Sequence, residues 1–152
     1  MVLQIGGEIQ MFIGNYQHNI DPKGRLSIPS KLRSLIQDSV VLSRGLDGCL
    51  ELRTNQEFEN YANKFLSQSN NKQQNRNYKR LLFANSLTVE IDSANRILIP
   101  ANFKKMANLS KEVVIIGMGD HIELWDINAY EQFNEANFDK FNELAESMDD
   151  DH

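Results

Sequence analysis

The sequence contains little cysteine or proline and no long apolar segment. Of its 152 residues, one is a cysteine, Cys49, and three are prolines. A single cysteine excludes a disulfide within the chain, which favours a reducing compartment such as the cytoplasm. No apolar run approaches the roughly 20 residues of a membrane-spanning helix, and the N-terminal segment lacks the basic residues that open a signal peptide. We therefore expect a cytoplasmic protein with no membrane partner.

The residue patterns of common catalytic and metal sites are missing as well. His18, His121 and His152 share no metal-ligand spacing with one another or with Cys49, whose strand-like surroundings indicate a buried apolar residue. The chain has no G-x-x-x-x-G-K-[ST] phosphate loop. We expect no enzyme activity, no metal or cofactor, and no small-molecule substrate.

Charge is distributed unevenly along the chain. The net charge is −5, but residues 131–152 hold eight acids against Lys140, a net of −7. Subtracting −7 from −5 leaves +2 for the remainder, so the net charge is a poor guide to the local potential. Two clusters contain many of the basic residues: Lys23, Arg25, Lys31 and Arg33, and then Lys72, Arg76, Lys79 and Arg80. The acidic composition therefore does not exclude a nucleic-acid partner.

One segment occurs twice. The stretches "DPKGRLSIPSKLRSL" (residues 21–35) and "DSANRILIPANFKKM" (residues 92–106) both carry an Asp, an Arg four residues later, an apolar stretch, Ile-Pro and a helix-like pattern. The flanking segments match in the same order, so two halves, about 11–66 and 83–138, carry the same series of elements. Two copies of this length are too few for a solenoid. They predict one pseudo-twofold unit.

Each half predicts a strand, a turn, a short strand, a helix led by proline, a β-hairpin and a second helix. The strands are expected at 15–20, 25–28, 40–43 and 49–53, and at 87–91, 96–99, 113–116 and 122–125. Thr54, followed by Glu57, and Asp126 are the expected N-caps of the second helices. The polar stretch 67–83 between the halves is expected to end in a helix that docks on the body.

The last segment of the chain combines an apolar face with an acidic face. The apolar face consists of Phe138, Phe141, Leu144, Ala145 and Met148. Such a stripe packs either on its own chain or on a neighbouring subunit. We expect its start to dock within the chain and its end, residues 146–152, to fray.

The repeated Asp and Arg allow several interpretations. Asp21 and Asp92 could share a proton as a catalytic carboxylate pair, but each has a turn to stabilise and an Arg four residues later, which disfavours catalysis. Arg25 and Arg96 either close their turns onto these carboxylates or are oriented by them to read guanine in the major groove of DNA. Lys23, in the first turn, would add a phosphate contact.

Together these motifs resemble the MraZ family of bacterial regulators of the division and cell-wall gene cluster. The resemblance runs from "MFIGNYQHNIDPKGRLSIPSKLR" through "GLDGCLEL" and "KRLLFANSLTVEIDSANRILIP" to "HIELWD". It implies a mixed α+β fold: a pseudo-twofold, AbrB-like swapped-hairpin β-barrel built from two intrachain repeats, with flanking helices. The expected divisions are an N-terminal extension (1–10), a first repeat with its connecting helix (11–82), a second repeat (83–138) and an acidic tail (139–152).

The resemblance also implies a sequence-specific DNA-binding transcriptional regulator that forms ring-like homo-oligomers, is cytoplasmic and nucleoid-associated, and binds short direct repeats in double-stranded DNA upstream of its gene cluster. Its DNA-binding residues would be Lys23, Arg25 and Arg96, with weaker contributions from Lys31 and Arg33, and Asp21 and Asp92 would orient the loops. The second loop has Ala94 and Asn95 where the first has Lys23 and Gly24, so the two loops are not expected to contribute equally. The alternative is a ring-forming scaffold in which the Asp–Arg motifs are structural.

Overall fold

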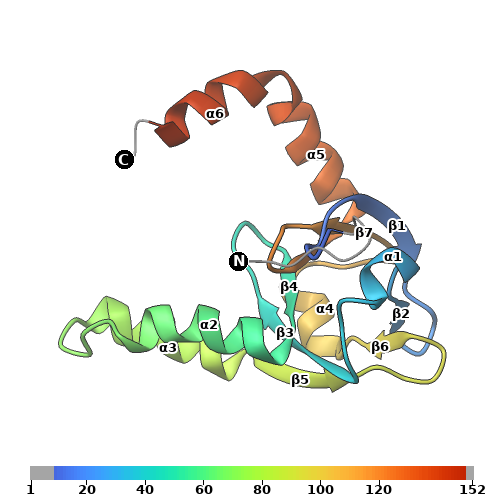
Figure 1. Ribbon diagram of the computed structural model, residues 1–152, viewed down its shortest axis with the longest axis horizontal. Coiled ribbons are helices and arrows are strands. Elements are labelled where there is room, and N and C mark those ends of the chain that lie inside the picture. The colour runs from blue at the N-terminus through green and yellow to red at the C-terminus, as the bar shows by residue number, and fades with distance from the viewer. Residues whose placement is uncertain (1–8, 150–152) are drawn as a thin grey trace.

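A computed structural model describes residues 9–149, so most of the predicted extension 1–10 and the last residues of the tail lie outside the described part. Eight strands form within these residues, on segments that either alternate in burial or are apolar over several successive positions (Figure 1). Their bounds are β1 Asn15–Asn19, β2 Arg25–Ser27, β3 Ser39–Arg44, β4 Leu50–Arg53, β5 Ser86–Glu90, β6 Arg96–Leu98, β7 Glu112–Gly117 and β8 Ile122–Asp126. All eight lie at positions that the sequence predicts.

The two halves of the chain exchange strands. In the main sheet the order is β1-β7-β8-β4-β3-β5, so β1 of the first half pairs with β7 of the second, and β5 of the second half pairs with β3 of the first. A second sheet consists of β2 and β6, again one strand from each half. Every pairing among the described strands is antiparallel. Each half therefore completes the sheet of the other.

The strand registers show that a pseudo-twofold axis relates the two halves. Leu26 of β2 lies opposite Ile97 of β6, which is its equivalent in the second repeat. In the same way Glu51 of β4 lies opposite Glu123 of β8. Hydrogen bonds beside the β2–β6 pair match across the axis: Ile28 N donates to Asn95 O at 2.9 Å, and Ile99 N donates to Gly24 O at 2.8 Å. The duplicated sequence thus folds into one symmetric body.

The main hydrophobic core is shared by the two halves. Its side chains come from both copies of the same strands and helices, because alternate residues of each strand face inward. Its fully buried members are Leu26, Leu32, Leu42, Leu50, Leu52, Ile97, Ile99, Ile115, Ile122, Leu124, Val40 and Val113. Neither half has a separate main core, which agrees with the single unit that the repeat predicts.

The closed barrel implied by the resemblance is not confirmed. Among the described strands the hydrogen-bonded ladder ends at β1 on one side and at β5 on the other, and β2 and β6 form a separate ribbon. The observed architecture is a mixed α+β body with an open, exchanged antiparallel sheet.

The helices flank this body. Their bounds are α1 Ser30–Arg33, α2 Asn55–Leu66, α3 Gln73–Ala84, α4 Ala101–Met106, α5 Ile127–Asn137, the 3-10 turn η1 Phe138–Lys140 and α6 Phe141–Asp149. Pro29 and Pro100 stand at the N-caps of α1 and α4, one residue before the helices begin. The predicted caps of α2 and α5 are confirmed: Thr54 accepts a hydrogen bond from the Glu57 N–H, and Asp126 accepts one from the Asn128 N–H.

The polar stretch between the halves becomes α3, which folds back on α2 (Figure 1). Phe65 of α2 and Tyr78 of α3 have ring centroids 5.0 Å apart, and Leu82 is buried at the base of the helical hairpin. The docking helix is thus confirmed. None of the described helices has the length and apolarity needed to span a membrane.

The expectation that the start of the C-terminal stripe docks within the chain is wrong. Helix α5 docks on the body through Tyr130 and Phe133, whose rings pack around Trp125. Beyond this contact the chain leaves the body as an arm (Figure 1), and Phe138 and Phe141 remain 73% and 77% exposed. The start of the stripe therefore does not dock on its own chain, and residues 150–152 of the segment expected to fray lie outside the described part.

Candidate functional site

The first Asp–Arg loop is held together by one carboxylate. Oδ1 of Asp21 accepts the backbone N–H groups of Lys23 and Arg25 at 2.9 and 2.8 Å. Oδ2 of the same carboxylate accepts the Nε–H of Arg25 at 2.8 Å. The Asp therefore shapes the turn with one oxygen and orients the guanidinium with the other.

The second loop repeats this geometry. Oδ1 of Asp92 accepts the N–H groups of Ala94 and Arg96, both at 2.9 Å, and Oδ2 accepts the Nε–H of Arg96 at 3.0 Å. The loss of lysine and glycine from the second turn therefore leaves its backbone unchanged. Asn95 adopts φ 62°, in the same left-handed region as Gly24 at φ 85°, and Asn tolerates that region better than most residues.

Strand exchange brings the two loops together. Because β2 pairs with β6, Arg25 lies opposite Leu98, and Ser27 lies opposite Arg96. The Nη1 atom of Arg96 comes within 3.9 Å of Oδ2 of Asp21, the carboxylate of the other loop. One composite site therefore contains both arginines, at the end of the molecule opposite the α2–α3 hairpin (Figure 1).

The electrostatics of this site keep both carboxylates charged. The N–H of Arg25 is the main cause that lowers the pKa of Asp21, with further contributions from the guanidinium of Arg25 and the N–H of Lys23. The N–H of Arg96 lowers the pKa of Asp92 in the same way. A carboxylate stabilised in its charged form does not exchange protons near neutral pH. This geometry suits orientation of the arginines better than proton transfer.

The arginines remain accessible after these contacts. The side chains of Arg25 and Arg96 are 32% and 31% exposed, and each gives its Nε–H to its own aspartate. In the described part of the chain, no hydrogen bond involves the Nη atoms of either residue. The terminal Nη groups are the donors that can approach a planar acceptor pair in two parallel hydrogen bonds.

The other basic residues that the sequence proposes are placed differently. Lys23 and Lys31 are exposed, whereas Arg33 is half-buried. Arg33 crosses to the second loop, where its Nε–H donates to Oδ1 of Asn95 at 2.9 Å, and its Nη1–H donates to the carbonyl of Ile36 at 2.6 Å. Arg33 therefore fixes the second loop against α1, which limits its availability for any ligand.

Two basic residues of this region were missed. Lys104 and Lys105 lie in the last turn of α4, as Lys31 and Arg33 lie in the last turn of α1. Their signal was present in the repeat, since "ANFKKM" aligns with "SKLRSL". The second half therefore carries positive charge on its helix even though its turn lacks a lysine.

The exchanged strands and the paired Asp–Arg loops define a class of protein: an internally duplicated α+β body in which one chain supplies both copies of a unit. Comparison with known proteins agrees. The family described as "MraZ protein, putative antitoxin-like" matches residues 11–81 and 82–151. A relative from Mesoplasma florum with the name "Transcriptional regulator MraZ" is 44% identical over 139 residues, which cover 91% of this chain and 95% of the relative. The chain belongs to the MraZ family.

Proposed function

We propose that this protein is a sequence-specific DNA-binding transcriptional regulator that contacts DNA through the Asp21–Arg25 and Asp92–Arg96 loops. The observation that carries the proposal is that each Arg hydrogen-bonds the Asp of its own loop through Nε and, within the described residues, makes no hydrogen bond through Nη. Each guanidinium is thus oriented through Nε, and the side chains of Arg25 and Arg96 remain 32% and 31% exposed. Arg in this arrangement is suited to bidentate contact with O6 and N7 of guanine, and the name of the Mesoplasma florum relative supports a regulatory role.

The two loops contribute unequally in this proposal. Lys23 adds an exposed ammonium beside Arg25, whereas Ala94 has no charge to offer beside Arg96. Lys31 supplies a weaker contact to a DNA phosphate. The contribution of Arg33 is also weak, because its Nε–H is hydrogen-bonded to Asn95 and its Nη1–H to the Ile36 carbonyl. Phosphate contacts position the protein and base contacts specify the sequence. The target is short direct repeats in double-stranded DNA upstream of the gene cluster, and the protein acts in the cytoplasm at the nucleoid.

Binding of the purified protein to the DNA upstream of its own gene tests this function. We expect Arg25→Ala to weaken specific binding by about 1–3 kcal/mol and Arg96→Ala by less. Lys23→Ala should weaken specific and non-specific DNA alike and reduce the salt dependence, because fewer counterions are released. Arg80→Ala is the matched control, since Arg80 lies on α3 and donates to Asn77. If a folded Arg25→Ala variant kept wild-type affinity and specificity for DNA, the proposed role of Arg25 would be wrong, and the scaffold interpretation would be favoured.

Self-association forms a second part of the proposal. The arm of η1 and α6 exposes Phe138, Phe141 and Met148 beside acidic residues, and Leu144 is 48% exposed. A groove on the α2–α3 hairpin is lined by Leu46, Tyr61, Lys64, Phe65, Gln68, Asn75, Tyr78 and Lys79. The two surfaces are complementary in charge and apolar character and lie on different parts of the chain (Figure 1). Contact between the arm of one copy and the groove of the next is head-to-tail, and such contacts form rings when the rotation closes.

Light scattering at several protein concentrations tests the assembly. We expect Phe141→Glu to shift the protein towards monomer, because it places a charge in the apolar contact. Glu131→Gln, on the exposed surface of α5, is the control. A ring also presents many loops to tandem repeats, so the Phe141→Glu variant should lose most of the preference for several repeats over one. A wild-type monomer that binds one repeat as tightly as several would contradict this part of the proposal.

A further inference from the structure

The face of the β4–β8 ladder that points away from the main core carries a cluster of one cysteine and two glutamates. None of these residues belongs to the Asp–Arg loops. Leu50 and Leu52 face the core, so Cys49 and Glu51 face the opposite side of the sheet. Glu51 lies directly opposite Glu123 on the pseudo-twofold axis. One ligand atom each from Cys49, Glu51 and Glu123 lies within 4.8 Å of the other two.

This cluster is enclosed. Cys49 is 1% exposed and Glu51 is 5% exposed, while Glu123 is half-buried. Each carboxylate already has a nitrogen partner: Arg53 pairs with Glu51, and Nε2 of His121 lies 3.7 Å from Oε2 of Glu123. The spacing of the three ligand atoms, rather than uncompensated repulsion, is therefore what suits a cation.

Neighbouring donors hold the carboxylates in fixed orientations. Nη1 of Arg53 donates to Oε1 of Glu51 at 2.5 Å, and the Arg53 guanidinium stacks 3.6 Å from the ring centroid of Tyr61. Nε1 of Trp125 donates to Oε1 of Glu123 at 2.9 Å. Hydrogen bonds from an outer shell orient ligating carboxylates in this manner in metal sites.

A second observation, independent of the acids and the thiol, points to a ligand at this position. Ser43 lies opposite Glu51 in the β3–β4 register, so the two side chains are on the same face of the sheet. Ser43 is fully buried, and its Oγ has no hydrogen-bond partner within residues 9–149. Buried hydroxyl groups are rarely left without a partner in folded proteins. A metal-bound water at the cluster would supply one.

We propose that Cys49, Glu51 and Glu123 form a binding site for a single divalent transition-metal ion of the zinc class. One sulfur and two carboxylate oxygens match the ligands that Zn²⁺ accepts, with a water in the fourth position. Ca²⁺ and Mg²⁺ prefer oxygen ligands only, so the thiol disfavours them. The inference does not depend on the proposed DNA-binding function.

Metal binding at this site would exchange the thiol proton for the metal ion. Sγ of Cys49 donates a hydrogen bond to the carbonyl of Leu46 at 3.2 Å, so the metal-free thiol carries its proton. Binding forms one sulfur–metal bond and releases the thiol proton to solvent. No electron is transferred, and each glutamate contributes one oxygen ligand.

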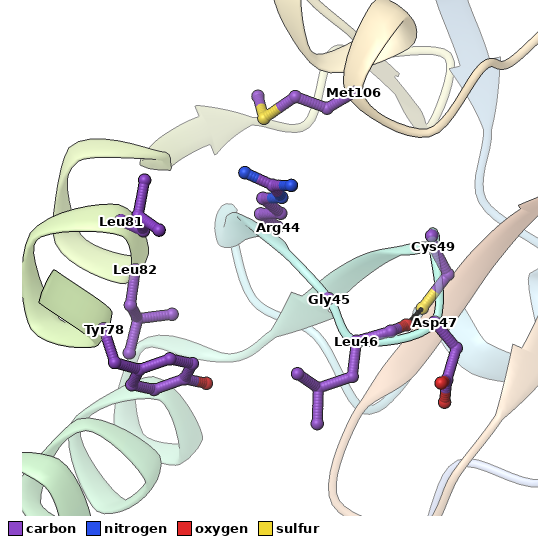
Figure 2. Close-up of a pocket in the computed structure, with 10 residues that line it drawn as sticks. Arg44, Gly45, Leu46, Asp47, Cys49, Tyr78, Leu81, Leu82 and Met106 are labelled. Atoms are coloured by element: carbon purple, nitrogen blue, oxygen red, sulfur yellow. Dashed lines mark hydrogen bonds between the residues drawn. The ribbon is translucent and has the colours of Figure 1, made fainter. Parts of the chain in front are cut away.

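Cys49 lies beside a cavity of about 300 Å³ between the β3–β4 turn and helix α3, lined also by Leu46, Tyr78 and Leu82 (Figure 2). The site also joins β4 of the first half to β8 of the second. A bound metal would therefore hold the two halves together at their axis, which makes its expected role structural.

Spectroscopy of the full-length protein with Co²⁺ and calorimetry with Zn²⁺ test the site. Cys49 is the only cysteine in the chain, so a thiolate-to-cobalt charge-transfer absorption can arise from no other residue. We expect this absorption at one ion per chain in the wild type, its loss in Cys49→Ala, and at least about tenfold weaker Zn²⁺ binding in Glu51→Gln and Glu123→Gln. The control is Glu112→Gln, whose carboxylate is exposed on β7 and accepts from Gln17.

Wild-type protein that binds Co²⁺ without the thiolate absorption, or does not bind it, would overturn the proposal. So would unchanged Zn²⁺ affinity in both glutamine variants. Circular dichroism of the metal-free variants verifies that they fold. Should Cys49→Ala not fold, the wild-type absorption and the two glutamine variants still decide the outcome.

Discussion

Arg96 and Asp21 belong to different copies of the repeated motif, yet Nη1 of Arg96 lies 3.9 Å from Oδ2 of Asp21. The same Oδ2 atom accepts the Nε–H of Arg25 at 2.8 Å. No ion pair within the described residues joins Asp92 to Arg25. Asp21 therefore contacts both arginines of the site, whereas Asp92 contacts its own.

This asymmetry predicts unequal effects of two matched substitutions. Asp21→Asn removes a charge that orients Arg25 and attracts Arg96, so we expect roughly tenfold weaker DNA binding. Asp92→Asn should cost several-fold less. Fluorescence anisotropy on the upstream DNA measures both, and thermal unfolding of each variant separates a loss of binding from a loss of the turn. An equal or larger effect of Asp92→Asn would contradict the prediction.

Substitutions at the two left-handed positions, Gly24 and Asn95, should change stability by different amounts. Gly24 has φ 85°, and a Cβ added there would lie 3.2 Å from the carbonyl oxygen of Ile99, so Gly24→Ala should destabilise the fold by about 1–2 kcal/mol. Asn95→Gly, at φ 62°, should change stability by less than about 0.5 kcal/mol apart from the loss of the Arg33 contact. Urea unfolding measures both. Full stability of Gly24→Ala would mean that the turn can change its conformation.

The stability of the protein should depend strongly on two core residues of the β2–β6 pair at the axis. Leu26 is fully buried and Ile97 is 1% exposed, and each packs in a core shared by both halves. Leu26→Ala and Ile97→Ala should each lower the free energy of unfolding by about 2–5 kcal/mol. Leu98→Ala is the control, because Leu98 is 53% exposed and should change it by no more than about 0.5 kcal/mol. Two separate unfolding transitions in either variant would argue against a single cooperative unit.

Asp126 predicts a dependence of stability on pH. Burial alone raises its pKa, but hydrogen bonds from Ser110 and Asn128 outweigh burial and hold the folded pKa below the ordinary 3.8. The unfolded chain therefore binds the proton more tightly, so the stabilisation is present above pH 3.8 and is lost as pH falls through the lower, folded pKa. We expect Asp126→Ala to cost about 1–3 kcal/mol at pH 7 and less near pH 3.

Denaturant unfolding at the two pH values measures the effect. Asp139→Ala is the control, because Asp139 is exposed on the arm and should have little effect at either pH. A cost of Asp126→Ala that stays constant between pH 7 and pH 3 would show that the charge of Asp126 does not stabilise the fold.

The sequence by itself determined the local elements. The repeat identified both Asp–Arg turns, and Thr54 and Asp126 were recognisable as caps, because a turn or a cap is completed by residues within four positions along the chain. The repeat, the turn residues and short apolar runs located all eight described strands, since each of these signals lies in or beside the strand itself. The family followed from the same segments.

Only the tertiary structure decided which strands pair. Alternation is satisfied equally whether β1 pairs within its own half or with β7, and the exchange is fixed by the shared core rather than by any short segment. The exchange in turn places Arg96 near Asp21 and Glu51 opposite Glu123, contacts that no spacing along the chain reveals. The same reason explains the wrong expectation for Phe138 and Phe141: an apolar stripe shows that a surface can be covered, but its partner depends on which faces the rest of the fold leaves open.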